Sequence, residues 1–221
     1  MVDICAVIFD RDGVLADFDY DGAMKFFENL PISLEELGQQ WQNWGKSYGF
    51  PSSLEDERLF FEGFWSNLGK ELHIPEENLN QYRKFNYAKY LLLFPDAKDI
   101  LAWLKVKGIR IGVLTNFTLA SVEMSLMTLG IWDYIDVACG ATTIGVAKPD
   151  PKAYKIVMNK LKTDPGKTIF FDDDIGHVDG ARYAGIVNSY FVNRDAQDHD
   201  LSKREVKDLS VIRGIIERTE H

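Results

Sequence analysis

The sequence predicts an α/β protein in which a doubly wound parallel sheet of five strands carries an inserted, all-helical domain. Short apolar runs rich in β-branched residues alternate with helical patterns in the second half of the chain, which is typical of a parallel sheet covered by helices on both faces. The first two apolar runs are separated by about a hundred residues, far more than a simple crossover requires. An insertion is therefore expected between them.

The alternating elements follow in a regular order. Buried strands are expected at Ile4–Phe9, Arg110–Leu114, Ile135–Ala138, Thr168–Phe171 and Ser189–Val192. Helices are expected at Ala97–Lys107, Ala120–Leu129, Lys152–Leu161 and Val178–Ala184. This order predicts a Rossmann-like core formed by residues 1–15 and 95–221.

The insertion, residues 16–94, has the features of a small helical domain. Ser33 and Glu36 form a capping-box pattern, and Pro75 suits the first position of a helix. We expect helices near Leu34–Tyr48, Leu54–Leu72 and Pro75–Leu92, and no strand. Of the 28 aromatic residues, 17 lie in this segment and are expected to form its core, although Trp41 and Trp44 could instead line a pocket.

Composition excludes several functions. The chain has 221 residues and a net charge of −9, which argues against a nucleic-acid partner. Two cysteines are too few for a disulfide framework or a four-cysteine zinc site and suit a reducing compartment. No stretch has the length of a transmembrane helix, and the first apolar run lacks the basic flank of a signal peptide. A cytoplasmic protein that does not bind membranes is expected; the sequence does not predict its oligomeric state.

Polar side chains follow three of the predicted strands. They are Asp10 and Asp12, then Thr115-Asn116, then Asp172-Asp173-Asp174, and Lys148 precedes the helix before the fourth strand. Because ligands bind beyond the carboxyl ends of parallel strands, these groups are expected to converge. Clustered carboxylates favour a hard cation such as Mg²⁺, and a lysine and a hydroxyl can bind an anionic group. Asp10 can act as a nucleophile on phosphorus, with Asp12 as acid and base.

With these motifs, the chain resembles the haloacid dehalogenase superfamily over essentially its full length. Asp10-Arg-Asp-Gly-Val-Leu15 matches the first family motif, Thr115-Asn116 the second, Lys148 in Val146–Pro151 the third and Asp172-Asp173 the fourth. The insertion resembles a type C1 helical cap. Dehalogenases of this family lack an acid–base aspartate two residues after the nucleophile, so Asp12 implies the phosphatase-like branch. Arg11 is expected to point away from the chemistry.

The resemblance implies a Mg²⁺-dependent phosphatase that cleaves a small phosphorylated metabolite through an aspartyl-phosphate. Phosphate would be bound by Thr115, Asn116 and Lys148. Mg²⁺ would be held by the Asp10 carboxylate, the Asp12 backbone carbonyl and Asp173, with Asp172 a weaker candidate. A sugar phosphomutase of the same fold and a non-catalytic binding protein are the alternatives.

Two further positions belong to the fourth motif. His177 replaces the second acid of that motif, either as a polar residue at a helix start or as an acceptor for Lys148 or a metal-bound water. Asp174 is expected to cap the following helix.

Overall fold

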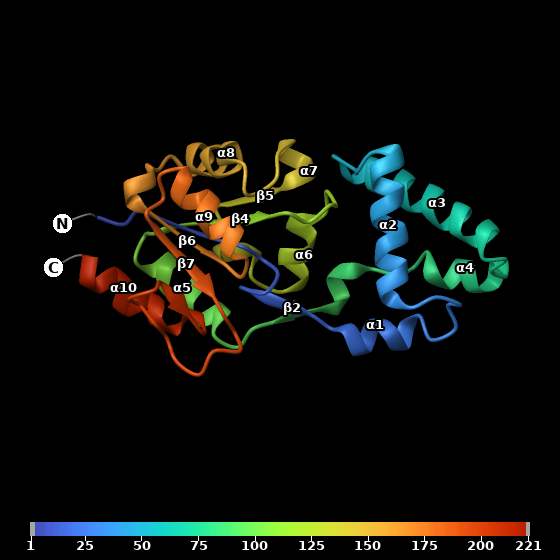
Figure 1. Ribbon diagram of the computed structural model, residues 1–221, viewed down its shortest axis with the longest axis horizontal. Coiled ribbons are helices and arrows are strands. Elements are labelled where there is room, and N and C mark those ends of the chain that lie inside the picture. Colours follow the sequence, from blue (N-terminus) through green and yellow to red (C-terminus); the bar gives the residue numbers. More distant parts are fainter. Residues whose placement is uncertain (1–2, 220–221) are drawn as a thin grey trace.

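The computed structural model describes residues 3–219 and contains a parallel sheet of six strands in the order β5-β4-β1-β6-β7-β8 (Figure 1). The strands are β1 (Ala6–Phe9), β4 (Arg110–Thr115), β5 (Val137–Gly140), β6 (Thr168–Asp172), β7 (Asn188–Val192) and β8 (Glu205–Val206). The predicted fold class is confirmed, and all five expected strands are present. The predicted number of strands was wrong, because β8 has only two residues and is too short to give a pattern in the sequence. Residues 1–2 and 220–221 of the predicted core domain lie outside the described residues.

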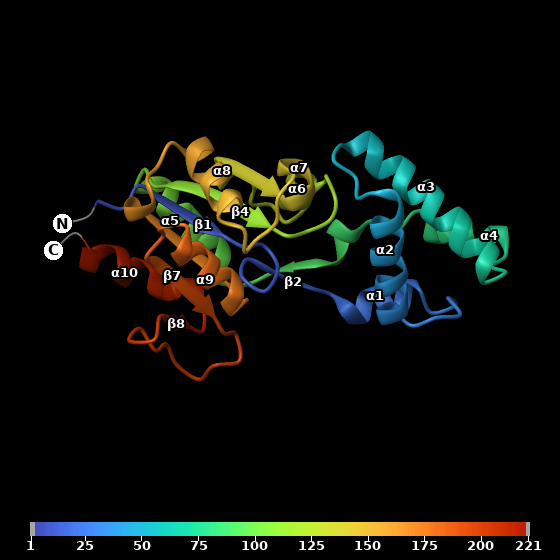
Figure 2. The same cartoon turned by 45° about the horizontal axis from the view of Figure 1, so that its top comes forward.

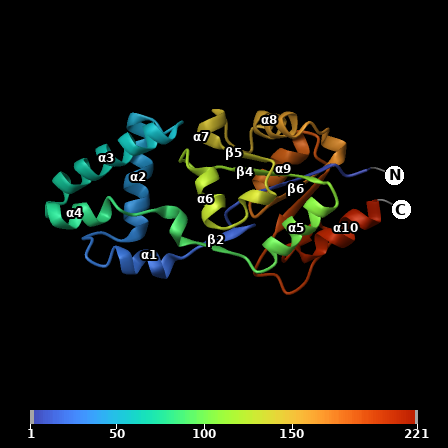
Figure 3. The same ribbon diagram turned by 180° about the vertical axis from the view of Figure 1, so that it is seen from behind.

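Helices cover both faces of this sheet. They are α5 (Ala97–Val106), α6 (Val122–Thr128), α7 (Ala141–Ile144), α8 (Pro151–Leu161), α9 (Ile175–Tyr183) and α10 (Ile212–Thr219). Short 3-10 turns lie at Trp132–Tyr134, Pro165–Lys167 and Leu209–Val211. Successive residues of β1 point to opposite faces. Val7 and Phe9 pack with residues of α5, α6 and α10, and Ala6 and Ile8 pack with residues of α8 and α9. These two groups of helices lie on opposite faces of the sheet (Figures 2 and 3).

The inserted segment forms a second group of helices at one end of the molecule (Figure 1). It contains α1 (Tyr20–Phe26), α2 (Leu34–Tyr48), α3 (Leu54–Glu71), α4 (Glu76–Tyr82) and the 3-10 helix η1 (Tyr87–Tyr90). Nine of its buried residues form a cluster separate from the two clusters of the sheet, as the aromatic content of the segment predicts. They are Phe27, Leu30, Leu37, Phe64, Trp65, Leu68, Ile74, Leu79 and Tyr82.

Two expectations for the insertion were wrong. The segment is not all-helical, because β2 (Ala16–Phe18) and β3 (Leu91–Leu93) pair antiparallel where the chain leaves and rejoins the sheet domain. Each strand has three residues, and its partner lies far away in sequence, so no local pattern reveals the pair. The single helix expected at Pro75–Leu92 is instead α4, η1 and β3.

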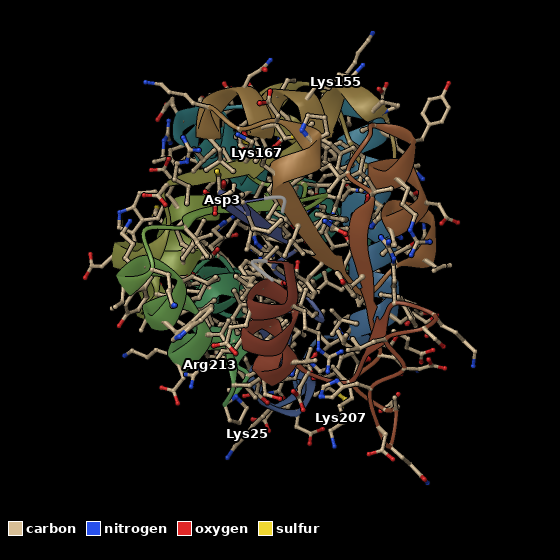
Figure 4. All side chains as sticks on the ribbon, turned by 90° about the vertical axis from the view of Figure 1, so that its left-hand side faces the viewer. Asp3, Lys25, Lys155, Lys167, Lys207 and Arg213 are labelled. Atoms are coloured by element: carbon tan, nitrogen blue, oxygen red, sulfur yellow. The ribbon has the colours of Figure 1, made fainter. Side chains whose placement is uncertain are left out.

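The end of the molecule opposite the inserted segment is polar. Figure 4 views this end, where the labelled side chains of Asp3, Lys155, Lys167 and Arg213 are exposed at the surface. Within residues 3–219, no helix combines the length and the apolar character required to span a bilayer.

Candidate active site

The site lies at the carboxyl ends of three adjacent strands. Phe9 of β1 pairs with Val113 of β4 on one side and with Phe171 of β6 on the other. The residues that follow these positions, including Asp10 and Asp172, are therefore brought to the same edge of the sheet. This edge faces the inserted helices (Figure 2). The polar groups at the carboxyl ends of β1, β4 and β6 therefore converge, as predicted.

Lys148 lies between two of these carboxylates. Its ammonium group is 2.9 Å from Asp10 Oδ2 and 2.6 Å from Asp172 Oδ2, and the residue is only 3% exposed. Asn116 fixes the backbone at this point, because its amide oxygen accepts from the Lys148 N–H at 2.8 Å and its amide nitrogen donates to the Lys148 carbonyl at 2.9 Å. The third motif is therefore held in place by the second.

Burial determines the electrostatics of this cluster. Burial raises the pKa of Asp10 to about 7, an effect larger than the opposing charge of Lys148. Burial would lower the pKa of Lys148, but Asp10 and Asp172 outweigh it and raise that pKa. The pKa of Asp172 is lowered despite burial, because His177 and Lys148 stabilise its carboxylate. Lys148 and Asp172 therefore form the charged pair, and Asp10 is the less well compensated carboxylate.

His177 connects two motifs and does not contact the Lys148 ammonium. Its Nδ1 lies 3.1 Å from Asp172 Oδ1, and its Nε2 lies 3.2 Å from the Asn116 amide nitrogen. Since that amide nitrogen can only donate, Nε2 is the acceptor, and Nδ1–H donates to Asp172. Asp172 thus binds the imidazole of His177 through one carboxylate oxygen and the ammonium of Lys148 through the other.

Asp173 and Asp174 have different surroundings. Asp174 caps α9, accepting from the backbone N–H groups of Gly176 and His177, as predicted. Asp173 lies against Gly13, whose φ of +70° favours glycine and where an added Cβ would lie 2.0 Å from Asp173 Oδ2. Burial and the charge of Asp172 raise the pKa of Asp173. Gly13 therefore leaves room for the exposed carboxylate of Asp173 beside the first motif.

A cavity of about 330 Å³ opens above Asp10 and Asp12. Its walls come from both parts of the chain and consist of Asp10, Asp12, Gly38, Trp41, Gln42, Tyr87, Thr115, Asn116, Phe117 and Thr118. Trp41 therefore lines this cavity as well as packing against its aromatic neighbours, whereas Trp44 lines two other cavities, of about 320 and 200 Å³. The Thr115 hydroxyl accepts from the Phe117 N–H at 3.1 Å, which leaves its own hydrogen available to a ligand.

Three side chains of the described part of the chain form a candidate group for a metal ion. Asp10, Asp172 and His177 offer ligand atoms within 4.8 Å of one another. The side chains of Asp12 and Asp173 are outside this group; Asp173 lines a separate cavity of about 320 Å³ together with Gly13. However, Lys148 already binds both carboxylates of the group. A cation there would meet a buried ammonium, which disfavours this position.

Comparison with known proteins adds an independent result. The profile of the family described as haloacid dehalogenase-like hydrolase matches residues 4–185. The chain belongs to the haloacid dehalogenase-like hydrolases. This hydrolase is 33% identical to "Phosphatase MT3486" of Mycobacterium tuberculosis, over 95% of this chain and 96% of that protein. It is 29% identical to a phosphoglycolate phosphatase of Nitrosococcus oceani, over 96% and 93% of the two chains.

The fold of this hydrolase is also found among solved structures. A HAD phosphatase from Thermococcus onnurineus matches with a TM-score of 0.64 and 22% identity, over 96% of this chain and 98% of that chain. The resemblance stated from the four sequence motifs is therefore confirmed at the level of the family. It was carried by residues that the structure gathers at one edge of the sheet.

One residue of the site was missed by the sequence analysis. The Arg11 side chain, expected to point away from the chemistry, is fully buried and binds the Asp12 carboxylate through Nε at 3.0 Å and Nη2 at 2.8 Å. Its backbone N–H donates to Asp10 Oδ1 at 2.7 Å. The sequence contains a usable signal: Arg11 is a lone arginine between two aspartates, two residues after a buried strand.

Proposed function

We propose that this hydrolase is a Mg²⁺-dependent phosphatase that cleaves the phosphate ester of a small, uncharged alcohol through an aspartyl-phosphate on Asp10. The observation that carries the proposal is that Asp10 and Asp12 line one cavity while Lys148, buried behind them, contacts Asp10. We further propose that residues 16–94 act as the cap that covers this cavity, since Gly38, Trp41 and Gln42 of α2 line it. Phosphate release from a panel of phosphorylated metabolites tests the activity.

In the first step, Asp10 Oδ attacks phosphorus, a new O–P bond forms and the bond to the ester oxygen breaks. Asp12 gives its proton to the departing alkoxide, so the alcohol leaves neutral. In the second step, Asp12 takes a proton from water, the water oxygen attacks phosphorus, and the Asp10 carboxylate is released with inorganic phosphate. Thr115, Lys148 and the backbone N–H of Asn116 would bind the phosphate oxygens throughout.

The residues at this edge suit Mg²⁺, which prefers oxygen ligands. We assign it to the Asp10 carboxylate, the Asp12 backbone carbonyl and Asp173. Two observations support this set over Asp172: the pKa values of Asp10 and Asp173 are raised, so their charges lack full compensation, whereas Asp172 is bound by Lys148 and His177. When bound, the ion would neutralise negative charge on the carboxylates and on the phosphate.

Mg²⁺ is expected to stabilise the protein against heat, and Asp173→Asn should remove most of this effect. His177→Ala should retain it, because His177 belongs to the network around Lys148. Since a proton on Asp10, whose pKa is about 7, competes with the ion, Mg²⁺ affinity should fall as the pH drops through neutrality. Thermal melts with and without Mg²⁺, at several pH values, measure both effects. If Mg²⁺ stabilises wild type and Asp173→Asn equally but no longer stabilises His177→Ala, the ion would instead be assigned to the group of Asp10, Asp172 and His177.

The cavity walls indicate an uncharged leaving group. Asp10 and Asp12 are the only charged side chains among the residues that line the cavity. The nearby cations are already paired, Lys148 with Asp10 and Asp172 and Arg11 with Asp12, so neither is left to balance a charge on the leaving group. A carboxylate on the leaving group would therefore face the carboxylates of Asp10 and Asp12 without a cationic side chain of its own in the cavity wall. Trp41, Tyr87 and Phe117 offer aromatic faces, and Gln42 and Thr118 offer hydrogen bonds, which suits a hydroxylated carbon skeleton.

Glycerol 3-phosphate is expected to be hydrolysed with a kcat/KM at least about tenfold higher than that of 3-phosphoglycerate. The carboxylate of 3-phosphoglycerate would be repelled by Asp10 and Asp12, and repulsion between like charges a few ångströms apart costs about a kcal/mol or more. The two compounds differ only in a hydroxymethyl group against a carboxylate, so they form a matched pair. Glucose 6-phosphate tests the aromatic wall: Trp41→Ala should raise its KM more than that of glycerol 3-phosphate. A preference for 3-phosphoglycerate would contradict this substrate class without contradicting phosphatase activity. Return of the phosphoryl group to the sugar, in place of free phosphate, would identify a mutase.

A further inference from the structure

Arg11 is the largest side chain that is fully buried in the described part of the chain. A buried guanidinium is stable only if it is paired and hydrogen-bonded. Three groups meet this requirement: the Asp12 carboxylate, the Ser125 hydroxyl at 2.9 Å from Nη1, and the ring of Phe117, whose centroid lies 4.2 Å from Cζ. Arg11 therefore occupies a site shaped around it, directly behind the proposed acid–base residue.

The contact with Asp12 has the geometry that orients a carboxylate. Nε donates to Oδ1 and Nη2 donates to Oδ2, so both carboxylate oxygens are held by one planar fork. The Asp12 side chain is 43% exposed and lines the cavity, so the lone pairs that Arg11 does not use are open to a ligand. The Asp12 carboxylate is thus held by Arg11 on its buried side and open to the cavity on its exposed side.

The position of Arg11 depends on both parts of the chain. Ser125 belongs to α6 and Phe117 to the loop after β4, and both lie in the sheet domain. Tyr87 belongs to η1 of the inserted segment; its ring centroid lies 5.5 Å from Arg11 Cζ and 4.6 Å from that of Phe117. A change in the position of η1 would therefore change the contacts of the Arg11 guanidinium, which binds Asp12.

We propose that Arg11 is the positioning residue that orients the Asp12 carboxylate for proton transfer, and that Tyr87 and Phe117 link this orientation to the position of the inserted segment. The proposal rests on the proposed phosphatase function. It does not require Arg11 to touch the substrate. It follows from a bidentate contact on a residue that must transfer a proton within hydrogen-bond distance of the leaving oxygen.

The test compares two leaving groups. An alkoxide needs a proton as it departs and an aryl oxide needs little, so a misplaced Asp12 should slow glycerol 3-phosphate far more than p-nitrophenyl phosphate. Arg11→Lys keeps the charge but loses the fork, and Arg11→Met loses both. In each, we expect the ratio of kcat for the alkyl ester to kcat for the aryl ester to fall roughly tenfold to a hundredfold, with KM little changed. In an Asp12→Asn background, neither substitution should change the ratio further.

Controls separate positioning from general loss of structure. Leu104→Ala removes a buried side chain of α5 that belongs to the core beneath the sheet; it should lower the melting temperature and leave the ratio unchanged. If the arginine variants fail to fold, Ser125→Ala should lower the ratio a few-fold; it removes the hydrogen bond to Nη1 together with the one that Ser125 Oγ donates to the Val122 carbonyl within α6. A wild-type ratio in the folded variants would overturn the proposal while leaving the phosphatase function intact. A wild type inactive on both esters would overturn the two together.

Discussion

Asp10→Asn is expected to abolish phosphate release, with kcat reduced by at least about 10⁴-fold, as when a covalent nucleophile is removed. The amide cannot form the acyl-phosphate bond and is a poorer ligand for Mg²⁺. The variant should still fold. Burial raises the pKa of Asp10 to about 7, above the value of 3.8 for an unperturbed group, so the ionised form costs stability at neutral pH and a neutral side chain removes that cost.

The measurement is phosphate release from glycerol 3-phosphate and from p-nitrophenyl phosphate, together with a thermal melt. Asp179→Asn is the matched control, because the same substitution at an exposed aspartate paired with Arg182 should leave turnover unchanged. Hydrolysis of both esters should be lost in Asp10→Asn, since both require the same nucleophile. Turnover within about a hundredfold of wild type would remove Asp10 from the role of nucleophile.

Long, regular elements could be predicted from the sequence because their signals are local. Helix α2 begins and ends as expected, at Leu34 and Tyr48, and the capping box between Ser33 and Glu36 is present. Strand β1 follows from an apolar run buried on both faces. By contrast, β2, β3 and β8 have two or three residues each and form only because a partner strand lies beside them. No short stretch of sequence therefore predicts them.

The candidate site could likewise be predicted only in part, in its location but not in its contacts. The meeting of Asp10, Thr115 and Asp172 follows from parallel strands whose carboxyl ends share an edge, which the alternation of elements already implies. The partner of each side chain does not follow. Whether Asp172 faces Lys148 or a metal ion, and whether Arg11 turns toward Asp12 or away, depends on packing by Phe117, Ser125 and His177, which come from distant parts of the chain.

Lys148→Met is expected to be the most destabilising of the substitutions considered, because it leaves two carboxylates, 7% and 0% exposed, without their shared counter-ion. Breaking a buried ion pair in this way typically costs about 3–5 kcal/mol. Activity should also be lost, since the ammonium that contacts Asp10 and would bind phosphate is gone. Urea denaturation of wild type and variant measures the difference in the free energy of unfolding, and Lys152→Met, at an exposed lysine of α8, is the matched control.

The dependence of this destabilisation on pH shows whether Lys148 stabilises the protein through its charge or through packing. In the unfolded chain, both carboxyl groups ionise with pKa values near 3.8; in the folded variant, burial is no longer opposed by Lys148, so the pKa of Asp10 should rise further and that of Asp172 should rise from its lowered value. Below about pH 4 the carboxyl groups are protonated in either state, so the destabilisation should be smallest there and should grow as the pH rises to neutrality. Adding Asp172→Asn to Lys148→Met removes one unpaired carboxylate and should recover part of the lost stability at neutral pH. A loss that is the same at acidic and neutral pH, with no recovery in the double variant, would show that Lys148 contributes by packing and not by charge.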